Sequence, residues 1–359
     1  MSRLPAWVDV GLIPVLNLTL ALAVAGVVIA LVGEDPLAAL SVMIDGAFVY
    51  PGSLGYTLHY ATNFVFTGLA VAVAFQARLF NIGAEGQAAI AGVAAAAVAL
   101  ALGPWLWGIV AIPLAIVAAA AGGALWAAVP GWLQAYRGSH IVITTIMFNF
   151  IAAGVVVALV SGPMKREGQA APKTAEIADS ARLPFVHDLA AGIGLEAGRS
   201  PLNLAFVLAL LVAFGVWVLV WRTRWGFALR AMGQSEPAAV YAGIPVRRLT
   251  VQAMAVSGAL AGLMAVNEVV GAQGEVVIDF TAGYGFTGIA VALMGRAHPV
   301  GVVLAALLFG ALFQGGAELD FEFQTITREM VLLVQGLIIL FSGALALLFV
   351  PALTRLLGR

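Results

Sequence analysis

The sequence predicts an all-α membrane protein, a polytopic bundle of about ten transmembrane helices in which some segments are broken or re-entrant. Its 359 residues are 62% hydrophobic and only 10% charged, with a mean hydropathy of +1.05. A soluble domain carries roughly 25% charged residues, so this chain has too little charge to cover a water-exposed surface. Apolar stretches of about 20 residues, the length that crosses a bilayer, also recur along most of the chain.

The apolar stretches divide the chain into ten predicted spans. They are 14–33, 54–75, 87–103, 105–130, 140–161, 202–221, 249–271, 281–295, 298–316 and 328–350. The third and the eighth are short and follow polar or glycine-rich sequence, which is typical of discontinuous helices. Segment 281–295 is the weakest of the ten and could be a re-entrant hairpin instead of a span. We therefore expect residues 1–359 to form a single transmembrane domain, with a first span that is retained and not cleaved.

The charges assign the two faces of this domain. With both termini in the cytoplasm, most basic residues fall in inner loops, whereas acidic residues dominate the short outer loops. The basic residues of the 162–200 segment are the main exception, and long translocated loops largely escape the charge rule. We expect 162–200 to be a partly ordered outer-face loop, and 34–53 to hold a short interfacial helix.

Composition and motifs exclude several functions. The net charge of −1 argues against nucleic acid as a partner. There are no cysteines, and the four histidines show no metal-ligand spacing. The chain has no phosphate-cradling loop and no hydrolase motif, so we expect neither an enzyme nor a bound cofactor.

A polar break lies between the second and third predicted spans. Asn81, Glu85 and Gln87 alternate with Gly83 and Gly86, directly after Phe80. Asn81 and Glu85 are four residues apart and share a face if this turn is helical. The break is either an inner-face loop that starts a helix or an unwound stretch that lines a pathway, since irregular backbone at membrane depth must face protein or a water-filled cavity.

Other polar residues stand inside apolar segments. For Asn149, as for Asn63 and Thr67, an interhelical hydrogen bond is the favoured interpretation, and contact with a substrate is the alternative. Glu268 is a functional candidate because it is ionisable, but its position near the end of a span weakens that case. Aromatic residues near these positions pack the bundle or stack on a base or a sugar ring, and they include Phe80, Tyr284 and Phe286.

Five arginines against one glutamate mark the segment 222–248. An arginine-rich loop between two spans stays in the cytoplasm. The segment has the length of a short helix bounded by Gly226 and by Gly243–Pro245, and Glu236-Pro237 suits a helix start. A membrane protein that presents a folded helix to the cytoplasm presents it to a partner.

Four pieces of sequence resemble one known family. They are Phe80-Asn-Ile-Gly-Ala-Glu-Gly-Gln87, 138–149, 228–244 and Gly283-Tyr-Gly-Phe-Thr-Gly-Ile-Ala-Val-Ala-Leu-Met294. They resemble the permease subunits of bacterial ABC importers for nucleosides and simple sugars, within the branched-chain amino acid/ribose permease superfamily. The resemblance covers roughly residues 50–350, and the length is similar to that of the larger of the two permeases that such systems encode.

The resemblance implies roles for particular residues. Ala238, Ala239 and Gly243 are similar to the core of the coupling loop that docks on the ATPase subunit, with Arg230 and Glu236 beside it. Here Glu236 precedes Pro237 and not the two alanines directly, which departs from the family pattern. The substrate pathway is then expected to include Phe80, Asn81, Glu85, Gln87, Asn149, Tyr284, Phe286 and Thr287.

The resemblance also implies partners. We expect a multi-pass protein of the bacterial inner membrane, paired with ATPase subunits that bind the ATP. A second homologous permease and an extracytoplasmic binding protein or lipoprotein complete the expected complex. The alternatives are a stand-alone secondary transporter of small polar solutes and a permease for simple sugars.

Overall fold

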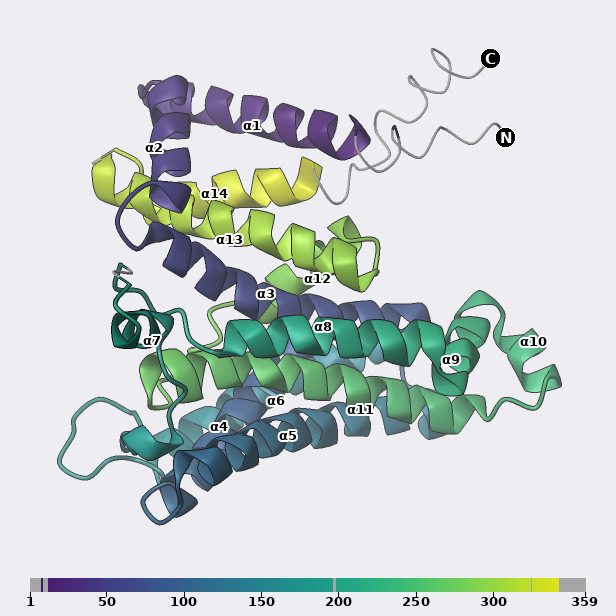
Figure 1. Ribbon diagram of the computed structural model, residues 1–359. Helices are drawn as coiled ribbons and strands as arrows, with labels where there is room; N and C mark the ends of the chain where they lie inside the picture. Colours follow the sequence, from purple (N-terminus) through teal and green to yellow (C-terminus); the bar gives the residue numbers. More distant parts are fainter. Residues whose placement is uncertain (1–7, 9–11, 196–197, 324, 342–359) are drawn as a thin grey trace, which may run out of the picture. The chain divides into compact units, whose positions relative to one another are not determined.

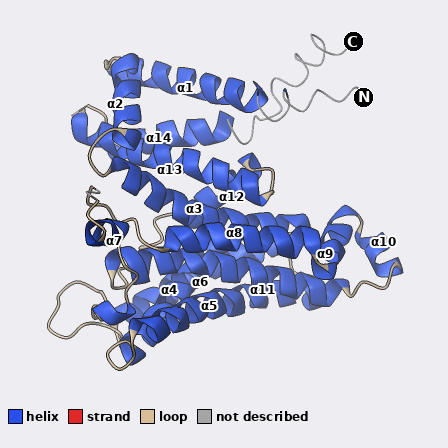
Figure 2. Cartoon of the chain, viewed as in Figure 1, coloured by secondary structure: helices blue, strands red, loops and turns tan. Residues whose placement is uncertain are grey.

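The protein is almost entirely helical (Figures 1 and 2). The computed structural model describes residues 8, 12–195, 198–323 and 325–341. Within that part, extended backbone pairs only at three isolated bridges. The predicted all-α class is therefore confirmed. The chain divides into two compact units, Met1–Thr57 with Phe309–Arg359, and Leu58–Leu308, and the boundary falls inside α3 (Ser53–Gln76) and α13 (Pro299–Glu322).

The first unit combines an N-terminal and a C-terminal segment of the chain. It holds α1 (Ile13–Val32), α2 (Pro36–Phe48) and α14 (Arg328–Ile339), with the adjoining turns of α3 and α13. The Asp35 carboxylate caps α2 by accepting a hydrogen bond from the Leu37 N–H, and Pro36 opens the helix. A Cβ at Gly315 would lie 2.3 Å from the Met43 carbonyl oxygen, so α2 and α13 meet backbone to backbone. The predicted short helix in 34–53 is thus present as α2.

The second unit is built around three closely packed helices. They are α4 (Ala84–Leu102), α5 (Gly108–Arg137) and α11 (Val246–Ala265), which continues as a π-helix, η3 (Val266–Gln273). A Cβ on Gly123 would stand 2.1 Å from the Gly258 carbonyl oxygen, so only glycine permits this contact between α5 and α11. Small residues at helix contacts are typical of membrane bundles, where close approach replaces the hydrophobic effect. Two further helices, α6 (Ile141–Ser161) and α8 (Ala205–Arg222), belong to the same unit.

The ten predicted spans all correspond to helices. Eight helices in the described residues are long and apolar enough to cross a membrane. The predicted span 281–295 is α12 (Tyr284–Met294), whose 11 residues cover about 16 Å, roughly half of a hydrocarbon core. This length favours the re-entrant alternative for that segment. The predicted span 328–350 begins with α14, and its residues from 342 onward lie outside the described part.

The 162–200 loop is more ordered than its composition predicts. It contains a 3-10 turn, η2 (Asp179–Ala181), and a short helix, α7 (Val186–Gly192). Three of its backbone N–H groups donate to carbonyl oxygens between Val270 and Val276. Lys173 also forms a 2.7 Å ion pair with Glu275. This loop is therefore fastened to the end of η3.

The arginine-rich segment 222–248 forms two helices and not one. The first, α9 (Arg224–Gln234), begins before Gly226, because the Thr223 hydroxyl caps it by accepting from the Gly226 N–H. The predicted boundary at Gly226 is therefore wrong. The second, α10 (Glu236–Tyr241), begins at Glu236-Pro237 as predicted. The turn that follows contains Gly243 in the left-handed conformation, with a φ of 76°.

Candidate functional site

A cavity of about 360 Å³ lies within the second unit. The start of α4, the middle of α6 and the loop before α12 form its walls. Its polar wall carries Glu85, Asn149, Asp279 and Thr281, and Phe150, Phe280 and Phe286 supply aromatic surface. Among its lining residues the only ionisable ones are the two acids. The cavity therefore combines hydrogen-bonding groups with aromatic surface, as small-molecule sites do.

Glu85 joins the two broken segments of the bundle. It lies in the first turn of α4, and its carboxylate accepts hydrogen bonds from the backbone N–H groups of Gly283 at 2.9 Å and Gly285 at 2.7 Å. These N–H groups belong to the start of α12, where an unpaired helix end attracts negative charge. A Cβ on Gly285 would lie 2.3 Å from the Glu85 backbone nitrogen, so the two helix starts touch directly.

Asn149 fastens α6 to the polar break. Its side-chain oxygen accepts from the Gly86 N–H at 2.9 Å, and its amide nitrogen donates to the Ile82 carbonyl at 2.9 Å. Both groups belong to backbone that has no partner in a regular helix at this point. Asn149 therefore makes the predicted interhelical hydrogen bonds while it also lines the cavity, so the two interpretations of this residue are compatible.

Asn81 and Gln87 are buried behind the cavity wall. Their amides bond each other in both directions, at 2.9 and 3.0 Å, and the Asn81 amide nitrogen also donates to the Ser257 hydroxyl on α11. Asn81 is fully buried, and neither residue lines the cavity. They hold the 80–83 turn in place, and Phe80 packs edge-on against Phe75 beside it.

The predicted residues of α12 face different surroundings. Tyr284 packs edge-on against Phe64 and Tyr60 of α3. Thr287 donates to the Gly283 carbonyl of its own helix. Only Phe286 lines the cavity, and its side chain is 48% exposed. The structure thus brings Glu85, Asn149 and Phe286 together at the cavity and leaves the other five predicted pathway residues in supporting positions.

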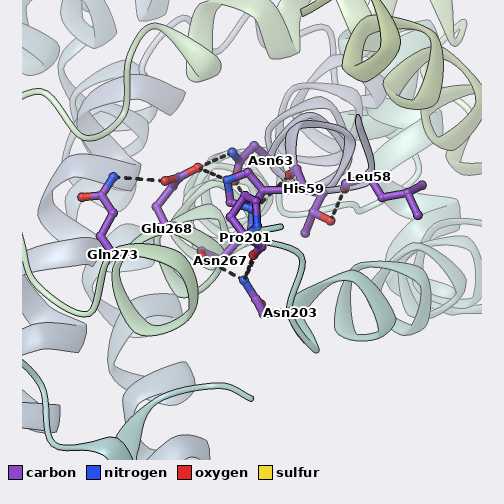
Figure 3. Close-up of polar contacts among 9 residues, drawn as sticks. Leu58, His59, Asn63, Pro201, Asn203, Asn267, Glu268 and Gln273 are labelled. Carbon is purple, nitrogen blue, oxygen red and sulfur yellow. Dashed lines mark hydrogen bonds and ion pairs between the residues drawn. The ribbon is translucent and has the colours of Figure 1, made fainter. Parts of the chain in front are cut away.

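A second polar cluster, around Glu268, lies in the same unit. Glu268 is only 4% exposed, so the expectation of a solvated position near the end of a span is wrong. Figure 3 shows it with His59 and Asn63 of α3. Asn267, which directly precedes Glu268 in η3, belongs to the same cluster. The sequence does contain an indication of this cluster. His59 and Glu268 are ionisable residues inside apolar segments, and Asn267 directly precedes Glu268.

The five residues of the predicted coupling loop differ in exposure. Ala239 is buried and Arg230 is half-buried, whereas Glu236, Ala238 and Gly243 are exposed. The most exposed large side chain of α10 is Tyr241, at 96%. This segment, the turn at 77–79 and the end of α5 together line a polar cavity of about 500 Å³. An exposed helix of this kind offers a surface to another protein.

The fold defines a polytopic membrane protein, with a cavity where the starts of its helices α4 and α12 meet. Residues 53–343 match the family described as branched-chain amino acid transport system, permease component, and the chain belongs to that family. It is 36% identical to the guanosine ABC transporter permease protein of Bacillus subtilis, over 93% of each chain. It is 34% identical to the glucose ABC transporter permease protein of Haloferax volcanii, over 94% of this chain and 88% of the relative.

A third relative agrees with these two. The nucleoside ABC transporter permease protein of Lactococcus lactis is 30% identical, over 92% of this chain and 90% of its own length. The predicted resemblance is confirmed, and the chain is a multi-pass permease subunit of an ABC transporter and not an enzyme. In such a system ATP is hydrolysed by ATPase subunits, which are this chain's partners together with the lipid bilayer.

Proposed function

We propose that this chain is the larger permease subunit of an ATP-driven importer of nucleosides or related sugar-containing small molecules. The observation that carries the proposal is the cavity where Glu85 joins the starts of α4 and α12. Transporters bind their substrates where broken helices meet, and this cavity lies at such a meeting point. Relatives of both the nucleoside and the sugar kind support the same class of ligand.

The chemistry of the cavity favours uncharged ligands that carry hydroxyl groups. A carboxylate such as Asp279 can accept hydrogen bonds from ribose or hexose hydroxyls, and an amide such as Asn149 can accept from them or donate to them. Phe150 and Phe286 offer faces on which a base can stack, at about 1–3 kcal/mol for each base. No lysine or arginine stands among the lining residues, and two acids do, so a phosphorylated ligand would be repelled.

The cavity requires a further wall. Phe150 is 71% exposed although it lines the cavity and belongs to an apolar helix. We assign the missing wall to the second, homologous permease subunit, whose corresponding face would close the cavity between the two chains. An extracytoplasmic binding protein or lipoprotein delivers the substrate from the outer face, where the 162–200 loop lies.

The ATPase acts at the opposite end. The helix α10 is exposed, short and closed by Gly243, which suits insertion into a groove of the ATPase. This role places 222–248 and both termini in the cytoplasm, in accord with the arginine bias, and the protein in the bacterial inner membrane. ATP is bound by the partner subunit, and neither a cofactor nor nucleic acid is required.

Reconstitution tests this function. The permease pair, the ATPase and the binding protein are placed in proteoliposomes, and uptake of radiolabelled guanosine and glucose is measured with and without ATP. We expect ATP-dependent uptake of guanosine that unlabelled adenosine inhibits and guanosine monophosphate does not. ATP-dependent uptake of glucose alone would support the sugar alternative. Uptake by this chain alone, driven by a proton gradient without ATP, would overturn the proposal in favour of a secondary transporter.

A further inference from the structure

A connected network of polar side chains is buried where α3 meets the π-helix η3 (Figure 3). Glu268 accepts from the Asn63 amide at 2.6 Å and from His59 Nε2 at 3.1 Å through the same oxygen, Oε1. Its other oxygen accepts from the Gln273 amide at 3.1 Å. Asn267 donates to the Asn63 side-chain oxygen at 2.8 Å. Polar groups at this depth are costly unless each one has a partner.

The network has a direction. Asn203 donates to Asn267, Asn267 donates to Asn63, and Asn63 donates to Glu268. An amide offers both a donor and an acceptor, but a carboxylate only accepts. Glu268 is therefore the terminal acceptor, and it determines which way the amides of Asn63 and Asn267 point. Removal of its oxygens would leave donors on three side chains without an acceptor.

The turn of α3 that carries these residues also contacts α12. His59 and Asn63 are followed directly by Tyr60 and Phe64, and both of these aromatic rings pack edge-on against Tyr284. Tyr284 is the first residue of α12, whose starting N–H groups bond Glu85 at the cavity. A continuous series of contacts thus runs from Glu268 through one turn of α3 to the cavity wall.

We infer that Glu268 is a positioning residue of the substrate cavity, which it serves by orienting the α3 turn against which α12 packs. Its carboxylate acts as a hydrogen-bond acceptor and not as a carrier of protons or ions. The π-helix is the local feature that makes this possible, because its wider turns place Asn267 and Glu268 together against α3, and π-helical turns occur frequently at functional sites. This inference rests on the function proposed above.

Two substitutions at position 268 separate the acceptor role from the charge. In Glu268→Gln the new amide keeps one oxygen for Asn63 and His59. Its nitrogen would face Gln273, whose Oε1 is buried without a partner, so a turn of the Gln273 amide restores that bond. Glu268→Ala provides no acceptor for any of these donors. Thr62→Val is the matched control, because Thr62 is buried on the same helix and bonds only the Leu58 carbonyl of that helix.

The experiment measures guanosine uptake by the complete complex in proteoliposomes. We expect Glu268→Ala to lower uptake efficiency about tenfold or more, because the buried donors of Asn63, His59 and Gln273 would lose their acceptor. Glu268→Gln and Thr62→Val should stay near the wild type. Equal loss in Glu268→Gln and Glu268→Ala would overturn the inference, since the charge would then be what matters, and so would normal uptake in Glu268→Ala.

A second measurement reports the position of α12 directly. The chain contains no cysteine, so Phe286→Cys introduces a single thiol on α12, and Ile193→Cys introduces one on the outer loop. Glu268→Ala should raise maleimide labelling at position 286 severalfold and leave position 193 unchanged. Equal changes at both sites would indicate general unfolding and overturn the positioning role. If the wild-type complex transports neither guanosine nor glucose, the proposed function fails, while the labelling result still decides the inference.

Discussion

Glu85 offers the most direct test of the cavity. Its two carboxylate oxygens hold the N–H groups of Gly283 and Gly285, one oxygen for each group. Glu85→Ala removes both acceptors, whereas Glu85→Gln keeps one oxygen and turns an amide nitrogen toward the other N–H. The two substitutions should therefore loosen the first turn of α12 in a fixed order, with alanine having the greater effect.

The size of the effect follows from the two hydrogen bonds. A hydrogen bond to a charged group contributes about 1.5–3 kcal/mol, but the cavity is open, and water can replace part of each bond. With about 1 kcal/mol lost for each bond, Glu85→Ala favours opening of the turn by about 2 kcal/mol, or roughly 30-fold. Glu85→Gln loses about half of that free energy, or roughly fivefold.

Hydrogen–deuterium exchange in nanodiscs measures this opening. Peptides that cover 283–287 should exchange faster in both variants, in the order alanine, glutamine, wild type. Asp279→Asn is the matched control, because it removes a negative charge from the same cavity and leaves the cap on α12 intact. Unchanged exchange in Glu85→Ala, or an equal increase in Asp279→Asn, would show that Glu85 does not hold α12.

Three further predictions concern packing and coupling. Gly123→Ala should lower the unfolding temperature of the purified chain, because its Cβ would overlap the Gly258 carbonyl at a cost of about 1–3 kcal/mol, whereas Gly154→Ala, with open space around it, should not. Tyr241→Ala should reduce co-purification of the ATPase without a change in unfolding temperature, since this side chain is almost fully exposed. An unchanged ATPase yield would argue against docking at α10. Gly243→Val should strain the left-handed turn after α10 and reduce substrate-stimulated ATP hydrolysis, and a normal coupling ratio would contradict this.

Much of the fold could be predicted because hydropathy is a local property. In the part of the chain that the structure describes, each predicted span contains a helix, since a backbone in lipid must satisfy its own hydrogen bonds. The 162–200 segment was predicted as a partly ordered loop, but the contacts that order it could not be predicted, because they are hydrogen bonds to residues near Gly274, almost 100 positions away. The division of 222–248 into two helices depended on caps at Thr223 and Ser235, and hydroxyl residues are too common to identify caps in a sequence.

The site was predictable only in part. The unusual residue types of the 80–87 break identified Glu85, and an amide inside an apolar helix identified Asn149. Which polar groups face the cavity and which face one another depends on helix rotation, and the sequence does not show it. Asn81 and Asn149 each follow a phenylalanine, yet Asn81 is fully buried and Asn149 lines the cavity. The burial of Glu268 was not predicted, because its position was inferred from its distance to the end of the span along the chain.

The glycine contact between α5 and α11 has a mechanical consequence. Backbones that touch without intervening side chains have no flexible layer through which to slide, so α5 and α11 must travel as one rigid body. The end of α5 lines the polar cavity beside α9 and α10. A displacement of α10 would therefore be transmitted along the whole length of both α5 and α11.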